Sequence, residues 1–292
     1  MQEKKLNTLL EILNYSAELL KNSGIKDARL NIELMLCDVL NCDRIKLYLD
    51  FDKPLSKNET DQFKLYLRRR LNKEPLQYIL GKTVFFGYEI FVDKNVLIPR
   101  PDTELLVESI LNDIFDSKKE FINILEIGTG SGCIIVAISK ELDKKNISYK
   151  IKSIDISERA LEIAFKNIKT NNLQLKNIEL KCEDFYDLDH MTESFDYIVS
   201  NPPYISSDEI PKLDDEIKNF EPLSALTDFD DGFKFYNKLF KLIKDSGNNT
   251  RVFLEIGYLH FDRLNLMLNE NCLNNVEFYK DYNDIYRVLK IN

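Results

Sequence analysis

The stretch Asn201-Pro202-Pro203-Tyr204 combines residue types that could hold a reacting nitrogen. It directly follows residues 195–200, which read as a short buried strand ending at a turn. A side-chain amide, two prolines and an aromatic ring offer oxygen acceptors and a flat surface, with few backbone N–H groups. These residues suit the binding of an NH2 group. The alternative is an ordinary Pro-Pro turn, with Asn201 as its cap.

A primary amide would fit these acceptors well. Asn201 can accept one amide hydrogen on its side-chain oxygen, and the Pro202 carbonyl can accept the other, because Pro203 keeps Pro202 extended. The nitrogen then presents its electron density out of the amide plane, where an electrophile could be attacked. We predict Asn201, Pro202 and Tyr204 as catalytic residues, and Asn201, Pro202, Pro203 and Tyr204 as the substrate-binding set. The motif alone does not distinguish a glutamine amide from an adenine amino group.

A glycine-rich segment, Gly128-Thr129-Gly130-Ser131-Gly132, lies between a predicted strand and an apolar helix. Glycines at such a point let the backbone approach a ligand closely. The spacing is G-x-G-x-G, whereas the dinucleotide fingerprint requires G-x-G-x-x-G, and Cys133 occupies its last position. We therefore predict a nucleotide-type ligand that has no pyrophosphate.

Acidic and aromatic residues follow the next two predicted strands. Asp155 ends the second strand, where a carboxylate can accept both ribose hydroxyls. Asp184 follows the third strand and could accept an adenine amino group, while Phe185 could lie on the ring or simply pack in the core. Because parallel strands end at one edge of the sheet, these residues should lie together. S-adenosyl-L-methionine, with S-adenosyl-L-homocysteine as its product, is the predicted cofactor.

The elements that would position these residues form two kinds of pattern. Apolar residues at helical spacing from Leu6 to Leu20, a capping Asp27, and a Ser56-x-x-Glu59 capping box predict a helical domain over 1–80. Residues 81–97 read as a hairpin linker. Over 98–292, alternating strands and helices predict a doubly wound α/β sheet of the Rossmann-like type, with an antiparallel pair at residues 276–278 and 286–291.

Composition narrows the function classes. The chain has 292 residues, is 44% hydrophobic and 30% charged, and carries a net charge of −9. This acidity disfavours direct binding to nucleic acid, although a local basic patch remains compatible with it. Five cysteines without paired spacing predict reduced thiols, and two histidines make a metal site improbable. Because no signal peptide or spanning segment is evident, we expect a cytoplasmic protein without membrane contact.

The chain resembles the HemK/PrmC family of peptide chain release factor N5-glutamine methyltransferases. Besides Asn201 to Tyr204, the resemblance covers several further stretches. These are residues 75–81 (Pro-Leu-Gln-Tyr-Ile-Leu-Gly), 85–87 (Phe-Phe-Gly), 97–104 (Leu-Ile-Pro-Arg-Pro-Asp-Thr-Glu), 221–222, 225–226, 231–232 and 254–257 (Leu-Glu-Ile-Gly). The likeness spans essentially the whole chain, is weakest in the helical region, and is most specific over residues 98–104.

The resemblance implies methylation of the glutamine in the Gly-Gly-Gln loop of class I peptide chain release factors. It implies that residues 1–80 recognise this substrate and that residues 98–292 transfer the methyl group. Gly128, Thr129, Gly130, Ser131, Gly132, Asp155, Asp184 and Phe185 would bind the cofactor, and Asn201 would touch both cofactor and glutamine. Two positions depart mildly from the family pattern, Phe185 where tryptophan is frequent and His260 where glutamine is common.

Two alternatives remain for the whole chain, and two local features are ambiguous. The chain could be a nucleic-acid amino-methyltransferase, acting on adenine-N6 or guanine-N2 of an extruded base, or a non-catalytic regulator that binds S-adenosyl-L-methionine. The basic run Arg68-Arg69-Arg70 reads as a solvated helix face or as a partner contact. Arg100, between two prolines, could shape the substrate wall or brace the domain linker.

Overall fold

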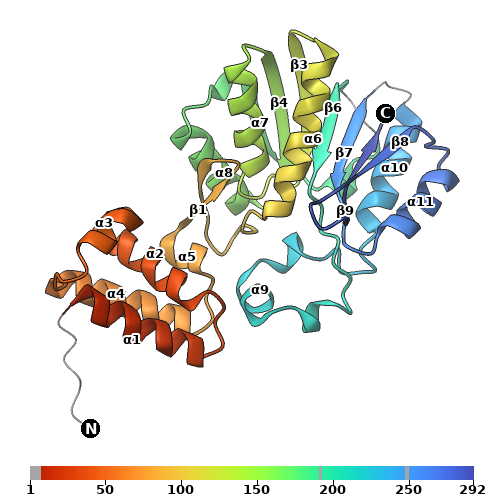
Figure 1. Cartoon of the computed structure of the whole chain (residues 1–292). Helices are drawn as coiled ribbons and strands as arrows, with labels where there is room; N and C mark the ends of the chain where they lie inside the picture. Colours follow the sequence, from red (N-terminus) through yellow and green to blue (C-terminus); the bar gives the residue numbers. More distant parts are fainter. Residues whose placement is uncertain (1–7, 191–192, 247–249) are drawn as a thin grey trace. The chain divides into compact units, whose positions relative to one another are not determined.

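The computed structural model describes residues 8–190, 193–246 and 250–292. These residues separate into two compact units. The first contains helices α1–α5 together with helix α9, a short segment from much later in the chain. The second contains the hairpin and the large sheet with its covering helices (Figure 1).

The first unit is all-helical around one apolar core. That core includes Leu13, Leu20, Ile32 and Met35, whose side chains are fully or almost fully buried. The helices are α1 (Leu9–Asn22), α2 (Ala28–Leu40), α3 (Arg44–Leu49), α4 (Lys57–Leu71), α5 (Leu76–Leu80) and α9 (Asp215–Phe220).

Of the two helix starts predicted from capping residues in this unit, one has the expected hydrogen bonds and the other does not. The capping box at Ser56 is confirmed, since its hydroxyl accepts the Glu59 N–H while the Glu59 carboxylate accepts the Ser56 N–H. The expectation that Asp27 caps α2 is wrong in its mechanism. Asp27 occupies the N-cap position but has φ +50°, and its side chain makes no capping hydrogen bond. A left-handed N-cap residue does not place its carboxylate over the helix N-terminus.

The basic run on α4 is mostly turned inward. Arg70 is only 4% exposed and donates to Asn31, to the Glu74 carbonyl and, at 2.8 Å, to Glu216 of α9. Arg69 forms a bidentate pair with Glu74, and Arg68 is exposed. The run is therefore neither a fully solvated face nor a continuous basic surface.

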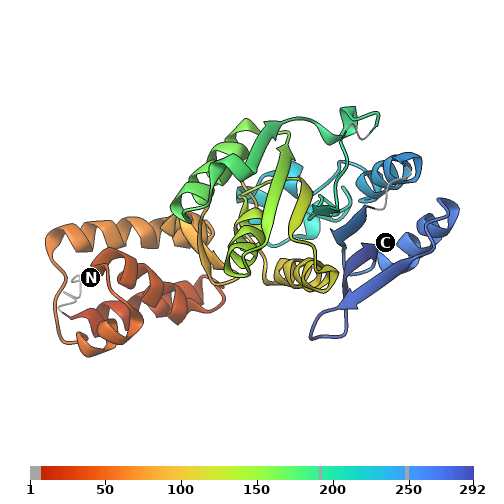
Figure 2. The ribbon, with the colours of Figure 1, turned by 90° about the horizontal axis from the view of Figure 1, so that it is seen from above.

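The second unit is built on a seven-stranded, mostly parallel sheet. Its strand order is β5-β4-β3-β6-β7-β9-β8, and β9 runs antiparallel to both of its neighbours. The strands are β3 (Phe121–Ile127), β4 (Ser148–Asp155), β5 (Ile178–Cys182), β6 (Tyr197–Ser200), β7 (Arg251–Glu255), β8 (Val276–Lys280) and β9 (Tyr286–Ile291). The predicted α/β fold and its terminal antiparallel pair are confirmed, and Figure 2 shows that pair beside the C-terminus.

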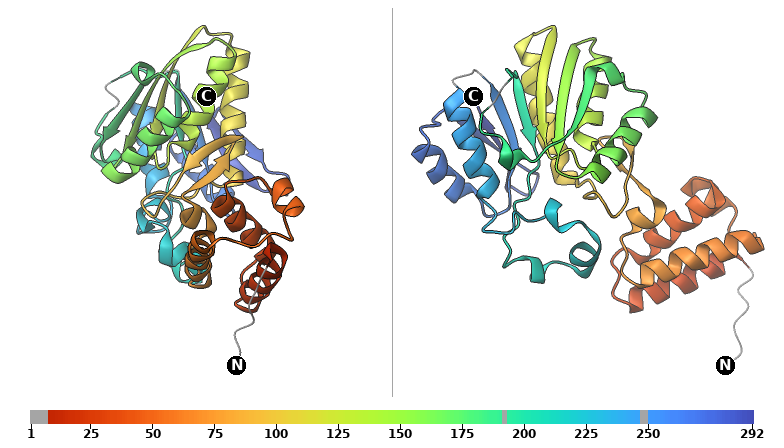
Figure 3. Two further views of the ribbon diagram at one scale, coloured as in Figure 1. Left: turned by 90° about the vertical axis from the view of Figure 1, so that its left-hand side faces the viewer. Right: turned by 180° about the vertical axis from the view of Figure 1, so that it is seen from behind.

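Helices cover both faces of this sheet. The helices are α6 (Pro101–Ser117), α7 (Cys133–Lys144), α8 (Glu158–Thr170), α10 (Lys234–Ser246) and α11 (Phe261–Glu270). Helices α6, α7 and α8 pack side by side on one face (Figure 1). Helices α10 and α11 share a second apolar core with the strands and lie toward the viewer in the view from behind (Figure 3, right). The central strands are buried on both faces, which explains their almost continuous apolar sequences.

The hairpin β1 (Lys82–Phe85) and β2 (Tyr88–Phe91) belongs to the second unit. Asn167 of α8 is completely buried and fixes it, because its side-chain amide accepts the Phe91 N–H at 2.7 Å and donates to the Phe91 carbonyl at 2.9 Å. The same amide donates to the Ser131 carbonyl at 2.8 Å, so one side chain holds both the hairpin and the glycine-rich loop.

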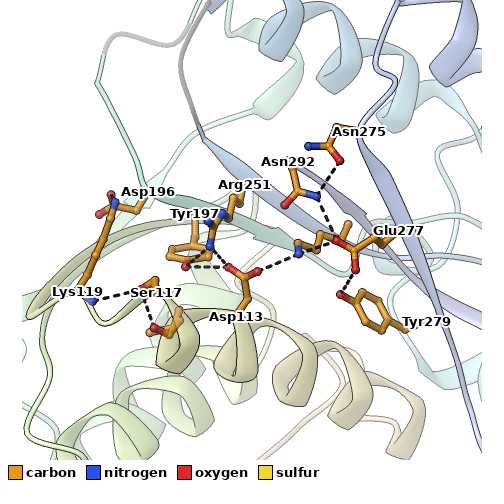
Figure 4. A network of polar contacts seen from close by, with 12 residues as sticks. Asp113, Ser117, Lys119, Asp196, Tyr197, Arg251, Asn275, Glu277, Tyr279 and Asn292 are labelled. Atoms are coloured by element: carbon orange, nitrogen blue, oxygen red, sulfur yellow. Dashed lines mark hydrogen bonds and ion pairs between the residues drawn. The ribbon is translucent and has the colours of Figure 1, made fainter.

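A polar network closes the edge at which the parallel strands begin, here called the amino edge (Figure 4). Asp113 of α6 accepts hydrogen bonds from Tyr197 of β6 at 2.9 Å and from Arg251 of β7, and it pairs with Lys290 of β9 at 2.9 Å. Burial acts to raise the pKa of Asp113, but these donors outweigh burial and hold that pKa below its ordinary value. The network ties four elements together where the sheet begins.

Candidate active site

The candidate site lies at the opposite edge, where the parallel strands end, here called the carboxyl edge. The chain leaves β3 toward β4 on one side and reaches β6 on the other, which makes β3–β6 the point where the strand order reverses. Ligands of α/β sheets bind at such a point. A cavity of about 350 Å³ opens there. Its lining includes Val96, Pro99, Arg100, Thr103, Gly128, Thr129, Gly130, Ser131, Asp155, Asp184, Phe185, Asn201, Pro202, Pro203, Pro222, Asp228 and Phe235.

The glycine-rich loop wraps the start of α7. Gly128 and Thr129 donate their N–H groups to the Ile154 carbonyl, which anchors the loop to β4. Gly132 precedes α7 at φ +75°, and a Cβ there would lie 3.0 Å from the Ala164 side chain and 3.1 Å from its Cα. The third glycine is therefore required by close helix packing, whereas Gly130 has open space in front of it.

Asp155 closes this loop from the neighbouring strand. Its two carboxylate oxygens accept the Gly130 N–H and the Ser157 N–H, each at 2.8 Å. Burial raises the pKa of Asp155, and the two backbone N–H groups oppose that rise. Since a carboxylate oxygen has two lone pairs, each oxygen keeps one acceptor position for a ligand hydroxyl.

Asp184 and Phe185 follow β5 and also line the cavity. Asp184 accepts the Tyr186 N–H at 2.8 Å, which caps a single 3-10 turn. Phe185 is 6% exposed and packs against Phe235 of α10, with ring centroids 4.7 Å apart. Phe185 is thus a core residue whose remaining surface forms part of the cavity wall, and both of its expected roles fit this position.

A buried carboxyl group, Glu126, lies beneath the loop. Ser153 donates to its Oε2 at 2.5 Å, and the Ser153 and Thr129 hydroxyls are 2.6 Å apart. Glu126 Oε1 has no hydrogen-bond partner among the described residues. Burial raises the pKa of Glu126 to about 8, with the Ser153 hydroxyl acting against it. The spacing of the glycines identified the loop but gave no role to this carboxyl.

Asn201 begins the loop after β6 with its amide held in one orientation. Its Nδ2 donates to the Thr103 hydroxyl of α6 at 3.1 Å. No described residue forms a hydrogen bond to Oδ1, and Asn201 lines the cavity. Ser200 secures the end of β6 by donating to the Ile127 carbonyl at 2.6 Å. Pro202 and Pro203 follow as part of the cavity wall.

Tyr204 is placed differently from the other three residues of the motif. Its hydroxyl donates to Glu255 Oε1 at 3.0 Å, and the side chain packs against the second core. Among the described residues, Tyr204 is not part of the cavity lining. Glu255 and burial together raise the pKa of this phenol far above its ordinary value, burial being the larger cause. The structure thus brings Asn201, Pro202 and Pro203 to the cavity and sets Tyr204 behind them.

The loop that follows the motif is closed by a glycine. A Cβ at Gly232 would lie 2.4 Å from the Tyr204 carbonyl oxygen, and its φ is +83°. Asp228 fixes the same turn by accepting the N–H groups of Asp230, Gly232 and Lys234. No other residue fits at Gly232 without displacing the backbone of Tyr204.

Pro99 and Arg100 also line the cavity. Arg100 donates to Glu221 Oε1 at 2.5 Å, and the Ile98 N–H donates to Glu221 Oε2 at 3.3 Å. The Glu221 side chain is 1% exposed. Arg100 therefore connects the segment that precedes α6 to Glu221. The same side chain also lines the cavity.

Sequence reasoning missed two residues behind the motif, Thr103 and Glu255. Both fall in stretches that resemble the family, so a signal for their importance existed. Their contacts with the motif join positions 98 and 51 residues apart. No spacing rule predicts such a pairing.

The residues of the cavity fit an adenosine-type methyl donor. The backbone of the loop approaches the cavity at Gly130, Asp155 keeps two acceptor positions for vicinal hydroxyls, and the wall is mainly apolar around Phe185. The volume of about 350 Å³ lies within the usual range for small-ligand pockets. The fold and this site define a class I methyltransferase.

Comparison with known proteins identifies the family. The family model described as the PrmC N-terminal domain matches residues 11–81, and the methyltransferase small domain matches residues 101–216. The chain is 38% identical to the release factor glutamine methyltransferase of Dictyoglomus turgidum, over 97% of this chain and 98% of that protein. It is 36% identical to the protein of the same name from Fusobacterium nucleatum, over 96% of this chain and 77% of that protein. The chain belongs to the release factor glutamine methyltransferase family.

Solved structures agree with the fold. The catalytic domain of hMettl16, determined with a MAT2A 3′UTR hairpin, aligns with a TM-score of 0.57 at 15% identity, over 87% of each chain. At this identity the likeness concerns the fold alone. Within the described residues, no helix is both long and apolar enough to cross a membrane.

Proposed function

We propose that this protein transfers a methyl group from S-adenosyl-L-methionine to the side-chain amide nitrogen (N5) of the glutamine in the Gly-Gly-Gln loop of class I peptide chain release factors, with S-adenosyl-L-homocysteine as the second product. The family supports the substrate. The observation that carries the chemistry is the fixed amide of Asn201, whose acceptor oxygen remains available at a cavity bordered by the glycine-rich loop.

The protein's part in the reaction is to hold the substrate amide. Asn201 Oδ1 and the Pro202 carbonyl accept the two hydrogens of the glutamine NH2 group. With both hydrogens held in plane, the electron density of the nitrogen is directed out of that plane. No strong base is required beforehand, because the amide nitrogen becomes acidic only as the new N–C bond forms. The proton that the nitrogen then loses would pass to solvent, and the electron pair of the broken S–C bond would leave on S-adenosyl-L-homocysteine. Positioning of this kind lowers a barrier by about 7–11 kcal/mol in favourable cases.

The cofactor, when bound, supplies a methyl group on a sulfonium centre, which needs no further activation. We assign its binding to Gly128, Thr129, Gly130, Ser131, Gly132, Asp155, Asp184, Phe185 and Asn201. In this assignment the Asp155 carboxylate accepts hydrogen bonds from the ribose hydroxyls, and the Asp184 carboxylate accepts a hydrogen bond from the adenine amino group. The apolar wall around the buried Phe185 side chain would exclude water from the adenine ring.

The acceptor geometry also supports selectivity for an amide. A carboxylate side chain brings no hydrogens to Asn201 and Pro202, so it would leave these acceptors unpaired, and sites of this kind reject such analogues strongly. Tyr204 completes the motif from behind, through its bond to Glu255. We assign substrate recognition to residues 1–80 and methyl transfer to residues 98–292, and we place the protein in the cytoplasm.

The test is a methyl-transfer assay with labelled S-adenosyl-L-methionine and four acceptors: a purified class I release factor, tRNA, rRNA and DNA. Mass mapping of the release factor should place the label on the glutamine of the Gly-Gly-Gln loop. A release factor with glutamate at that position serves as the matched control and should stay unlabelled. Label in nucleic acid and none in protein would overturn the proposal in favour of an amino-methyltransferase acting on bases.

A further inference from the structure

Phe229 combines three properties that the proposed reaction leaves unexplained. It lines the cavity, it is 66% exposed, and its φ is +60°. A large side chain rarely adopts this left-handed conformation, because its Cβ comes close to the following carbonyl oxygen. Strained residues of this kind are concentrated at active sites and ligand clamps. A strained and exposed aromatic residue on a cavity wall therefore calls for a ligand.

Other residues with a left-handed φ have a local explanation that Phe229 lacks. Asn41 and Lys118 are the C-cap residues of α2 and α6, a place where this conformation is common. Phe86 lies in the tight turn between β1 and β2 and is partly buried. Phe229 lies neither at a helix end nor in the hairpin. Its conformation is therefore set by the turn that carries it.

Hydrogen bonds on both sides of Phe229 tie this turn to the chain that follows the motif. The Ile205 N–H, directly after the motif, donates to the Leu226 carbonyl at 2.9 Å. The Ser207 N–H donates to the Asp230 carbonyl at 2.9 Å. Phe229 lies between these two anchors, so its backbone has little freedom to withdraw from the cavity.

This placement favours the acceptor substrate, and not the cofactor, as the ligand of Phe229. Asp155 ends β4 and Phe185 follows β5, and Phe185 already supplies an aromatic wall for the adenine that we assign there. Phe229 is instead tied to the chain after Tyr204, at the end of the motif that would hold the substrate amide. A protein substrate must enter the cavity from solvent, where an exposed side chain of the lining can meet it.

We propose that the Phe229 ring packs on the backbone of the substrate's Gly-Gly-Gln loop and selects for glycine directly before the glutamine. The proposal rests on the proposed function. Glycine has no Cβ, so its backbone can lie close against a flat ring, whereas any other residue brings a Cβ toward that ring. An aromatic ring buries a large apolar area and has only two side-chain torsions to fix. Because the turn that carries Phe229 is anchored, the ring does not yield to a larger residue.

The experiment measures kcat/KM for release factor methylation in wild type, Phe229→Ala, Phe229→Gly and Phe229→Tyr. Phe121→Ala is the matched control, because Phe121 is a 53% exposed phenylalanine where β3 begins. We expect kcat/KM to fall about 10-fold in Phe229→Ala and in Phe229→Gly, since both remove the apolar contact. Phe229→Tyr keeps the ring and should stay near the wild-type value, as should Phe121→Ala.

Selectivity separates a substrate contact from a structural role. Each variant is also assayed with a release factor that carries alanine directly before the glutamine. Wild type should prefer the Gly-Gly-Gln substrate, and this preference should shrink about 10-fold in Phe229→Ala. The Kd for S-adenosyl-L-homocysteine should remain within about threefold of wild type. Phe229→Gly relieves the left-handed strain, so its unfolding temperature should equal or exceed that of wild type.

Three outcomes would count against these expectations. Equal kcat/KM and equal selectivity in wild type and Phe229→Ala would overturn the role of Phe229 and leave the proposed function intact. A weaker affinity of Phe229→Ala for S-adenosyl-L-homocysteine would also overturn that role, because the ring would then contact the cofactor. A wild-type protein that labels no release factor removes the proposed function, and the role of Phe229 with it.

Discussion

The two edges of the sheet are built from the same elements but surround their buried carboxyl groups differently, so that the pKa values of these groups shift in opposite directions. Helix α6 contributes Asp113 to the amino edge and Thr103 to the carboxyl edge, while β7 begins with Arg251 and ends with Glu255. At the amino edge, Asp113 is surrounded by three donors and its pKa is lowered. At the carboxyl edge, Glu126 and Glu255 are buried and form no salt bridge within the part of the chain that the structure describes, and burial raises their pKa values.

We infer from this difference that the amino edge mainly stabilises the sheet, whereas the carboxyl edge carries the candidate site. Saturated charges at the amino edge hold β6, β7, β9 and α6 in register. At the carboxyl edge, one carboxylate oxygen of Glu126 and one of Glu255 have no hydrogen-bond partner among the described residues. Groups at functional sites are frequently perturbed in this way. Substitutions at the amino edge should therefore lower the free energy of unfolding, and substitutions at the carboxyl edge should lower the rate of methyl transfer.

The largest expected effect on activity is at Asn201. In Asn201→Ala, methyl transfer should fall by about 1,000-fold, because the principal fixed acceptor for the substrate NH2 group is removed. Binding of S-adenosyl-L-methionine should survive in part, since the glycine loop and Asp155 are unchanged. Single-turnover rates and calorimetric titration measure the two effects separately. Asn283→Ala on an exposed turn is the control. Undiminished turnover in Asn201→Ala would refute the mechanism.

The largest expected effect on stability is at the other edge. Asp113→Asn should lower the free energy of unfolding by about 2–4 kcal/mol, because Lys290 and Arg251 lose the charge that pairs with them. Urea unfolding measures the loss. The rate per folded molecule should stay near the wild-type value. A large loss of kcat with little loss of stability would mean that the two edges are not separable in this way.

The contributions of the two edges to the free energy of unfolding should change with pH in opposite directions. Glu255 has its pKa raised to about 7, so its contribution to stability is present below its unfolded value near 4.5 and is lost as the pH rises through 7. Asp113 has a lowered pKa, so its contribution is present above about 3.8 and is lost as the pH falls through its folded value.

Glu255→Gln should flatten the decline in stability between pH 4.5 and 7, measured by urea unfolding at several pH values. The groups that face Glu255 are Thr103, Tyr204, Asp102 and Arg287, and the Tyr236 hydroxyl donates to its backbone carbonyl. Of these, Asp102 raises and Arg287 lowers its pKa, so neither charge reverses the expected sign. A decline in stability that is as steep in Glu255→Gln as in wild type would contradict this assignment of the pH dependence to Glu255.

The smallest expected effect is at the exposed rim of the amino edge. Lys119 is half-exposed and pairs with Asp196. Lys119→Ala should change the free energy of unfolding by no more than about 1 kcal/mol, since exposed ion pairs contribute little. The same urea series measures it. A loss as large as that of Asp113→Asn would show that the whole network, and not its buried centre, stabilises this edge.

The predictable part of this protein was the part governed by periodicity and by strand ends. Asp155 ends a strand, and the glycine loop, Asp184 and Asn201 each follow one, and parallel strands place such residues together. The contact of Asn201 with Thr103 and that of Tyr204 with Glu255 were not predictable, because Thr103 and Glu255 come from α6 and β7, and only the fold brings them to the motif. The mechanism at Asp27 failed for a local reason, since a left-handed φ at the N-cap cannot be read from residue type alone.

Helix α9 has a consequence for how this chain can be divided. Its residues, Asp215–Phe220, belong to the helical unit, although they lie between the motif at Asn201 and the turn at Asp228. The polypeptide therefore passes between the two units three times. No single cleavage yields both units whole, and a fragment that ends at Gly81 lacks the Glu216 partner of the buried Arg70. The helical unit is therefore completed by a segment from the same stretch of chain that joins the motif at Asn201 to the turn at Asp228.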